Sequence, residues 1–233
     1  MAATTTTTTP SNAPANAADP GQFVELVDIG WDQYVAISEA IGERPNPRLI
    51  YCDRRLEIVV TSRRHDWFAE RLGQLVVAVA SGCGIRWEDA GTATYRRADE
   101  EVGVEGDKTF YLGPHAEQMK GAVDIDLDSQ PPPDLAIEVE VSHSANQALK
   151  VWGRLGVPEV WRFDPLRDRV TFWRRKDDGT YEAIDRSRGL PALTPADVLE
   201  QLKLADAIGA GEWFARLNDW VRDVIRPRPD QAR

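Results

Sequence analysis

The stretch PPPDLAIEVEVS, residues 131–142, decides the fold prediction because apolar and acidic residues alternate along it. Side chains of a strand point alternately to its two faces. One face therefore carries Leu135, Ile137, Val139 and Val141, and the other carries Asp134, Ala136, Glu138 and Glu140. Neighbouring carboxylates raise each other's pKa and destabilise a fold unless positive charge lies between them. A metal ion would supply that charge, and exposure of this face to solvent is the alternative.

The composition is typical of a globular protein, with 42% hydrophobic and 28% charged residues in a chain of 233. No apolar run approaches the roughly 18 residues of a membrane span, and no basic segment followed by an apolar one opens the chain. We therefore expect a cytoplasmic protein with no membrane contact. The net charge is −10, and residues 98–142 alone hold 12 acids against two lysines. This balance disfavours a large nucleic-acid surface but allows a local one.

The chain divides into three parts by composition. Residues 1–20 are of low complexity and nearly without bulky side chains, so we expect a disordered tail. Residues 21–195 carry the predicted elements of one domain. Residues 196–233 predict a helical extension docked on that domain, because apolar side chains recur at helical spacing in Trp213, Leu217 and Trp220.

The hydrophobic periodicity predicts a mixed α/β layer fold. The predicted helices span about 23–42, 63–80 and 144–155, the second capped by Thr61 or Ser62. A hairpin over 48–61 turns at Asp53-Arg54. Further strands are predicted around 85–88, 92–97, 108–112, 135–141, 159–163, 169–175 and 181–184.

Acidic residues on neighbouring strands suggest chemistry on a phosphodiester. Hydrolysis of that bond needs an activated water and relief of the phosphate charge, and a magnesium-like ion supplies both. Such ions take one or two carboxylates together with waters and substrate oxygens. Glu138 lies in the middle of its strand with Glu140 on the same side, and Asp107 opens the strand 108–112. Lys150, on the following helix, could position the water.

Each of these residues also has a structural interpretation. Asp107 follows a glycine and could be a turn residue, and Asp134 could begin its strand after three prolines. Glu138 and Glu140 could each form an ion pair, and Lys150 could be a surface lysine. Spacing alone leaves these alternatives open.

Three motifs in order carry a resemblance to a known family: GVEGDKTFYL (103–112), PPPDLAIEVEVSHS (131–144) and LGVPEVWRFD (155–164). With RRLEIVVTSRRHDWFAERLGQLV (54–76), including His65, they resemble the Uma-two family of restriction endonucleases. The resemblance covers about residues 45–195. It implies the PD-(D/E)XK nuclease fold, a restriction-endonuclease-like central mixed β-sheet flanked by helices.

The resemblance also implies a function and a site. It implies an endonuclease that hydrolyses DNA with Mg²⁺ or Mn²⁺, in which Asp107 matches the Asp of the PD motif and Glu138 the first acid of (D/E)XK. These two side chains would hold the metal, and the backbone carbonyl of Val139 would add a ligand. Glu57 or Glu70 would be a further acid near the site.

The sequence departs from the family pattern at two places. Gly106 stands where the family has proline, and Glu140 stands where (D/E)XK has lysine. Many members carry that lysine four residues before an aromatic residue of the next helix, where this chain has Ala148 before Trp152. Lys150 is about 200° around the helix from position 148.

The displaced lysine leaves two hypotheses. In the first, Asp107, Glu138, Glu140 and Lys150 form a working nuclease site, with His143 or Gln147 as substitutes that orient water. In the second, the fold is catalytically inactive and acts in DNA or protein binding. A homodimer formed through the apolar C-terminal helices is an expectation attached to the second hypothesis.

Overall fold

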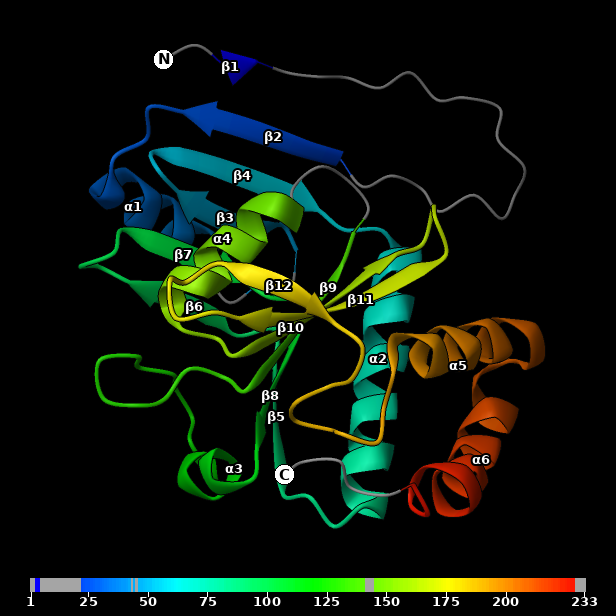
Figure 1. The fold of residues 1–233 in the computed structure, drawn as a ribbon. Helices are drawn as coiled ribbons and strands as arrows, with labels where there is room; N and C mark the ends of the chain where they lie inside the picture. Colours follow the sequence, from blue (N-terminus) through cyan, green and yellow to red (C-terminus); the bar gives the residue numbers. More distant parts are fainter. Residues whose placement is uncertain (1–2, 5–21, 43, 45, 141–144, 229–233) are drawn as a thin grey trace, which may run out of the picture.

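The computed structural model describes residues 3–4, 22–42, 44, 46–140 and 145–228, which build two β-sheets and the helices that cover them (Figure 1). The prediction for residues 1–20 lies outside these ranges except at residues 3 and 4. Those two form the short strand β1 (Ala3–Thr4), which pairs with Leu26 and Glu25. No helix of the described ranges is long and apolar enough to cross a membrane.

The first sheet is antiparallel throughout and has the strand order β1-β2-β4-β3-β7-β6. The bounds of its strands are β2 (Gln22–Val27), β3 (Arg48–Cys52), β4 (Arg55–Val60), β6 (Thr94–Arg97) and β7 (Val102–Glu105). The predicted turn at Asp53-Arg54 is confirmed: both residues have positive φ, 50° and 60°, and connect β3 to β4.

The second sheet is mixed and has the order β12-β11-β10-β9-β8-β5. Its strands are β5 (Trp87–Gly91), β8 (Lys108–Leu112), β9 (Leu135–Val139), β10 (Glu159–Asp164), β11 (Arg169–Arg175) and β12 (Tyr181–Ile184). Strands β9 and β10 are parallel and are joined through helix α4 (Ala145–Leu155), whereas the other pairs are antiparallel. The predicted restriction-endonuclease-like mixed sheet flanked by helices is this sheet.

The two faces of β9 enter different cores, as its alternation predicts. Leu135, Ile137 and Val139 pack with α2 (Arg63–Gly82), which begins after the predicted cap Ser62, whose Oγ accepts from the His65 N–H at 3.2 Å. Ala136, on the other face, packs with α4 and residues of the first sheet. Helix α4 thus lies between the two sheets (Figure 1).

Four further helices and a π-helical turn complete the layers. Helix α1 (Trp31–Ile41) covers the outer face of the first sheet, and α3 (Pro114–Met119) follows β8. Helices α5 (Pro195–Ile208) and α6 (Ala210–Trp220) and the turn η1 (Val221–Ile225) lie beside α2 (Figure 1). Trp213 and Leu217 are buried in the core that α2 shares with the mixed sheet.

The structure corrects the prediction of one helix over residues 23–42. The first part of that range belongs to β2, whose residues pair with β4, and the helix begins only at Trp31. Asp28, with a φ of 62°, separates the two elements. Strand β7 and helix α3 were not predicted, because each is four to six residues long and has little periodicity.

Candidate active site

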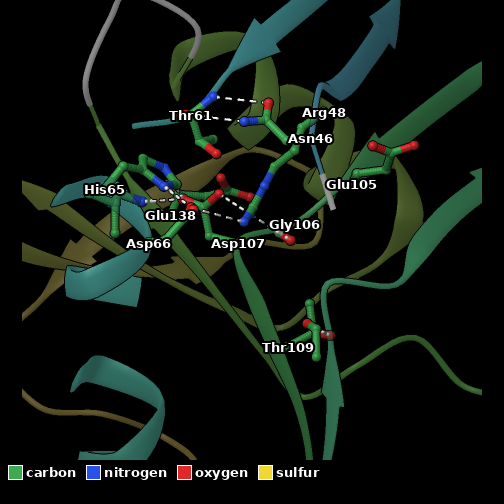
Figure 2. A network of polar contacts seen from close by, with 12 residues as sticks. Asn46, Arg48, Thr61, His65, Asp66, Glu105, Gly106, Asp107, Thr109 and Glu138 are labelled. Atoms are coloured by element: carbon green, nitrogen blue, oxygen red, sulfur yellow. Dashed lines mark hydrogen bonds and ion pairs between the residues drawn. The ribbon is translucent and has the colours of Figure 1, made fainter. Parts of the chain in front are cut away.

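The pairing of β8 with β9 brings Asp107 level with Glu138. Lys108 pairs with Ile137 in the antiparallel register, so the residue before β8 lies opposite the next residue of β9. Oδ2 of Asp107 accepts a hydrogen bond from the Val139 N–H at 2.7 Å. Both acids are buried, with 4% and 8% of their surfaces exposed, and Figure 2 shows them within one polar network. Two of the four predicted catalytic residues therefore meet.

Two cationic side chains neutralise Asp107. Arg48, from the start of β3, forms an ion pair with Oδ1 and donates to the Gly106 carbonyl at 3.1 Å. His65, in the first turn of α2, lies with Nε2 2.9 Å from Oδ2 (Figure 2). Burial raises the pKa of Asp107, but the charges of His65 and Arg48 outweigh it, so the pKa falls below its usual value.

The same contacts favour a protonated His65. Its Nδ1 lies 3.2 Å from Asp66 Oδ1, so each ring nitrogen faces a carboxylate. Burial lowers the pKa of His65, but the adjacent Asp107 carboxylate reverses this effect, and the net pKa is raised. A doubly protonated imidazole donates from both nitrogens and fixes the orientation of Asp107.

Among the described residues, Glu138 has fewer partners than Asp107. Its Oε1 accepts from the indole N–H of Trp152 at 2.7 Å, and Trp152 comes from the buried face of α4. Burial and the nearby charge of Asp107 raise the pKa of Glu138 to about 8. At neutral pH the pair thus consists of an ionised Asp107 and a largely protonated Glu138.

Trp152 also explains why glycine precedes Asp107. A β-carbon added at Gly106 would lie 2.8 Å from the Trp152 ring. Any other residue there, including the proline of the family pattern, would have to displace the indole that binds Glu138. This departure from the pattern is therefore part of the way the two acids are packed.

The structure places the other predicted catalytic residues elsewhere. Glu140 is paired with Arg162, with Arg162 Nε 2.8 Å from Glu140 Oε2, as its structural interpretation proposed. Lys150 is exposed and forms an ion pair with Asp53 in the β3–β4 turn, at the opposite end of β3 from Arg48. The structure does not bring Lys150 to the acid pair, because Trp152, two residues on, faces Glu138 and Lys150 faces away.

The remaining candidates have separate roles. Asp134 accepts from the Leu112 N–H at 2.7 Å and lies 2.9 Å from His115 Nδ1, which fits the start of a strand. Gln147 donates weakly to the carbonyls of Ile50 and Arg55, both at 3.4 Å. His143 lies outside the described residues.

The two additional acids also differ in their surroundings. Glu57 is buried on β4, and burial raises its pKa to about 7. Glu70, on α2, lies 3.4 Å from Lys108 Nζ and remains half exposed. Neither residue contacts Asp107 or Glu138 through a hydrogen bond or ion pair that the described residues show.

Arg48, His65 and Trp152 are the site residues for which sequence reasoning assigned no role. Arg48 opens a strand whose five residues are all buried, and a charged residue in such a strand seldom lacks a partner. That signal could have marked Arg48, but it could not have named Asp107, 59 residues away.

The acid pair fits a divalent ion that is shared with a substrate phosphate. Two carboxylates together with phosphate oxygens and waters are a set that Mg²⁺ takes. Within the described ranges no group of three or more His, Cys, Asp and Glu side chains could hold an ion by itself. Arg48 and His65 also engage both Asp107 oxygens. The side chains therefore do not form a complete protein cage for a permanently bound metal.

A mixed sheet flanked by helices, with an Asp at the start of one strand paired with a Glu on the adjacent strand, defines a protein of the restriction-endonuclease-like class. Residues 31–207 match the Uma2 family, described as putative restriction endonuclease, and the chain belongs to this family. The resemblance inferred from its motifs is confirmed. No curated protein matches the chain.

A solved structure supports the fold. It is described as a putative nuclease belonging to DUF820 from Anabaena variabilis, and it superposes with a TM-score of 0.50 at 12% sequence identity. The match covers 74% of this chain and 98% of the other. At this identity the likeness shows the shared fold alone.

Proposed function

We propose that the chain is an endonuclease that hydrolyses DNA phosphodiester bonds with Mg²⁺ or Mn²⁺. The observation that carries this proposal is the meeting of Asp107 and Glu138, both buried, on adjacent strands of a fold whose family is described as restriction endonuclease. Acids are seldom buried side by side without a function or a complete set of partners. Among the described residues Glu138 accepts one hydrogen bond, from Trp152, and its pKa is raised by burial and by the charge of Asp107.

The side chains of the site would act as follows. Asp107 and Glu138 would hold the ion, which when bound activates a water and relieves the phosphate charge. The imidazolium of His65 and the Val139 N–H fix the Asp107 carboxylate. Trp152 fixes Glu138, which must release its proton to become a ligand. Arg48 supplies a permanent positive charge within the network.

The second candidate function is binding of DNA or protein without hydrolysis, because a site that lacks the lysine would not activate water. The observation that favours it is the ion pair of Lys150 with Asp53, which leaves the acid pair without a lysine in the described ranges. A homodimer through the C-terminal helices remains a prediction attached to this candidate.

Nicking of supercoiled plasmid with Mg²⁺ or Mn²⁺ tests the proposal. Glu138→Gln keeps the size of the side chain and removes its charge, so we expect the rate to fall roughly 10²-fold or more, as for other electrostatic elements of a transition state. Glu182→Gln, which alters an exposed pair with Arg174, is the matched control and should keep the wild-type rate. Plasmid binding without nicking by the wild type would favour the second candidate, and nicking that survives in Glu138→Gln would contradict the site.

A further inference from the structure

Arg48 has a buried N–H donor that no acceptor of the described residues reaches. Its side chain is buried, and its Nε–H lacks a hydrogen-bond partner among the described residues. Nη1 contacts Asp107 and the Gly106 carbonyl, whereas Nη2 lies 3.7 Å from Asp66 Oδ1, longer than a hydrogen bond. A buried guanidinium with an unsatisfied N–H is unfavourable unless an acceptor reaches it. The unpaired donor therefore points to a ligand with acceptor oxygens.

The same arginine covers the oxygen that a metal ion would need. Asp107 Oδ2 already faces His65 and the Val139 N–H, and among the described residues Oδ1 is paired with Arg48 alone. A divalent cation and a guanidinium at one carboxylate oxygen repel each other strongly in a buried site. A cation can therefore take Oδ1 only when Arg48 releases it.

A phosphate group would give Arg48 a new partner. The planar guanidinium matches phosphate oxygens in a two-pronged geometry, and the strength of such a bond is comparable to that with a carboxylate. The unpartnered Nε–H and the poorly paired Nη2 lie on the same guanidinium and can form one such two-pronged contact. A phosphate at the site would thus draw Arg48 from Asp107 and contribute oxygen ligands for a cation.

We propose that Arg48 exchanges Asp107 for a phosphate of the nucleic acid, and that this exchange frees Asp107 Oδ1 for the divalent ion. Phosphate and metal then bind with positive coupling, and the free protein binds the metal weakly. The proposal rests on the proposed function for the identity of its ligands. It assigns to Arg48 a phosphate contact, a role distinct from the positioning of water that the sequence suggested for Lys150.

Calorimetric titration with Mn²⁺, with and without thymidine 3′,5′-bisphosphate as the phosphate probe, tests the exchange. In the wild type we expect the probe to tighten Mn²⁺ binding about tenfold, which is within the usual range of coupling between two ligands. Arg48→Met should bind Mn²⁺ tightly without the probe and should lose the coupling. Arg48→Lys keeps the charge but not the planar fork, so its coupling should be weaker than in the wild type.

Two controls locate the effect. Arg48→Met combined with Glu138→Gln should lose the Mn²⁺ binding that Arg48→Met gains, and Arg174→Met, which alters a surface pair, should behave as the wild type. Thermal unfolding of each variant shows whether it is folded. Where Arg48→Met does not fold, the wild-type coupling and Arg48→Lys decide the question.

The outcomes separate this inference from the proposed function. Equal Mn²⁺ affinity of the wild type with and without the probe would overturn the exchange, even if the protein nicks DNA. Unchanged Mn²⁺ affinity in a folded Arg48→Met would overturn it as well. Coupling that depends on Arg48 in a protein that never nicks DNA would support the exchange and contradict the endonuclease.

Discussion

Two buried glutamates on neighbouring strands, Glu138 on β9 and Glu159 on β10, differ in how completely the protein satisfies them. Each accepts from a tryptophan indole, Trp152 at 2.7 Å and Trp161 at 2.6 Å. Glu159 also accepts from the backbone N–H groups of Arg188 and Gly189, at 2.7 and 3.0 Å. Glu138 instead lies beside a second carboxylate, Asp107.

The difference separates a structural carboxylate from a candidate ligand. Burial raises the pKa of Glu159, and its N–H donors oppose that effect by favouring the ionised form. Glu159 thereby anchors the loop that follows β12 to the sheet. Burial and the charge of Asp107 both raise the pKa of Glu138. Among the described residues the only hydrogen-bond donor to Glu138 is the Trp152 indole, which opposes that rise. Both carboxylates are buried, and the number of hydrogen-bond donors around each distinguishes the structural one from the candidate ligand.

The largest expected effect is the difference in stability between the two variants in which either glutamate is replaced by glutamine. Glu159→Gln places an amide where three N–H donors require acceptors, so we expect a loss of about 3 kcal/mol in the free energy of unfolding. The glutamine of Glu138→Gln resembles the protonated form that Glu138 adopts at neutral pH. The free energy of unfolding of this variant should therefore differ from that of the wild type by less than about 1 kcal/mol.

Urea unfolding at pH 7 measures both values. Exposed Glu117→Gln, on α3, is the control for a glutamate without such contacts. Similar losses at positions 138 and 159 would contradict the distinction between the two carboxylates.

A third buried glutamate, Glu57, sharpens the comparison through pH. Its Oε2 is buried and has no hydrogen-bond partner in the described part of the chain. Burial and the charge of Glu25 raise its pKa to about 7 from an ordinary value of 4.5, although Arg55 opposes them. The folded state therefore holds this proton more tightly than the unfolded chain does.

The sign of the pH effect follows from that affinity. The contribution of protonated Glu57 to stability is fully present below about pH 4.5 and is lost as the pH rises through about 7. Glu57→Gln removes this loss. The free energy of unfolding of the variant minus that of the wild type should therefore be about 2 kcal/mol higher at pH 8 than at pH 4.5. Thermal unfolding from pH 4.5 to 8 measures it, and parallel curves for the two proteins would exclude a raised pKa at Glu57.

The sequence predicted the parts of the fold and site that depend on local pattern. The alternation in β9 correctly assigned Leu135, Ile137 and Val139 to one core and Glu138 to the opposite face. The motifs also identified Asp107 as its partner, because strands that carry the two family acids pair in the sheet.

Contacts between distant segments were not predictable in this way. Arg48 meets Asp107 only because β3, in the other sheet, begins near the start of β8, and nothing in the residues around Arg48 specifies that contact. The pairing of Lys150 with Asp53 has the same origin, since a β-turn and a helix almost a hundred residues apart meet. Periodicity determines which side of an element is buried, whereas the partner across the core depends on the whole topology.

The smallest expected effect concerns the two indole donors. Trp161→Phe and Trp152→Phe each keep an aromatic ring and remove one N–H, so the losses from packing are similar and their difference reports the hydrogen bonds. A bond to an ionised group contributes roughly 1.5–3 kcal/mol and a neutral one about 0.5–1.5. We therefore expect Trp161→Phe to lower the free energy of unfolding by about 1 kcal/mol more than Trp152→Phe in urea at pH 7. The reason is that the donors around Glu159 favour its ionised form, whereas Glu138 is largely protonated.

The two rings provide a check on the packing assumption. Trp161 stacks on Phe172 with ring centroids 4.4 Å apart, and Trp152 contacts Tyr95 edge-on at 5.3 Å. Phenylalanine can keep either contact, so leucine at the same positions gives the cost of losing the ring in each core. The loss in the free energy of unfolding for each phenylalanine variant is then corrected for the loss of the ring measured with leucine. A greater corrected loss at Trp152 than at Trp161 would mean that Glu138 is ionised in the free protein. In that case Arg48 and His65 would neutralise both carboxylates together, and the asymmetry between Asp107 and Glu138 would be wrong.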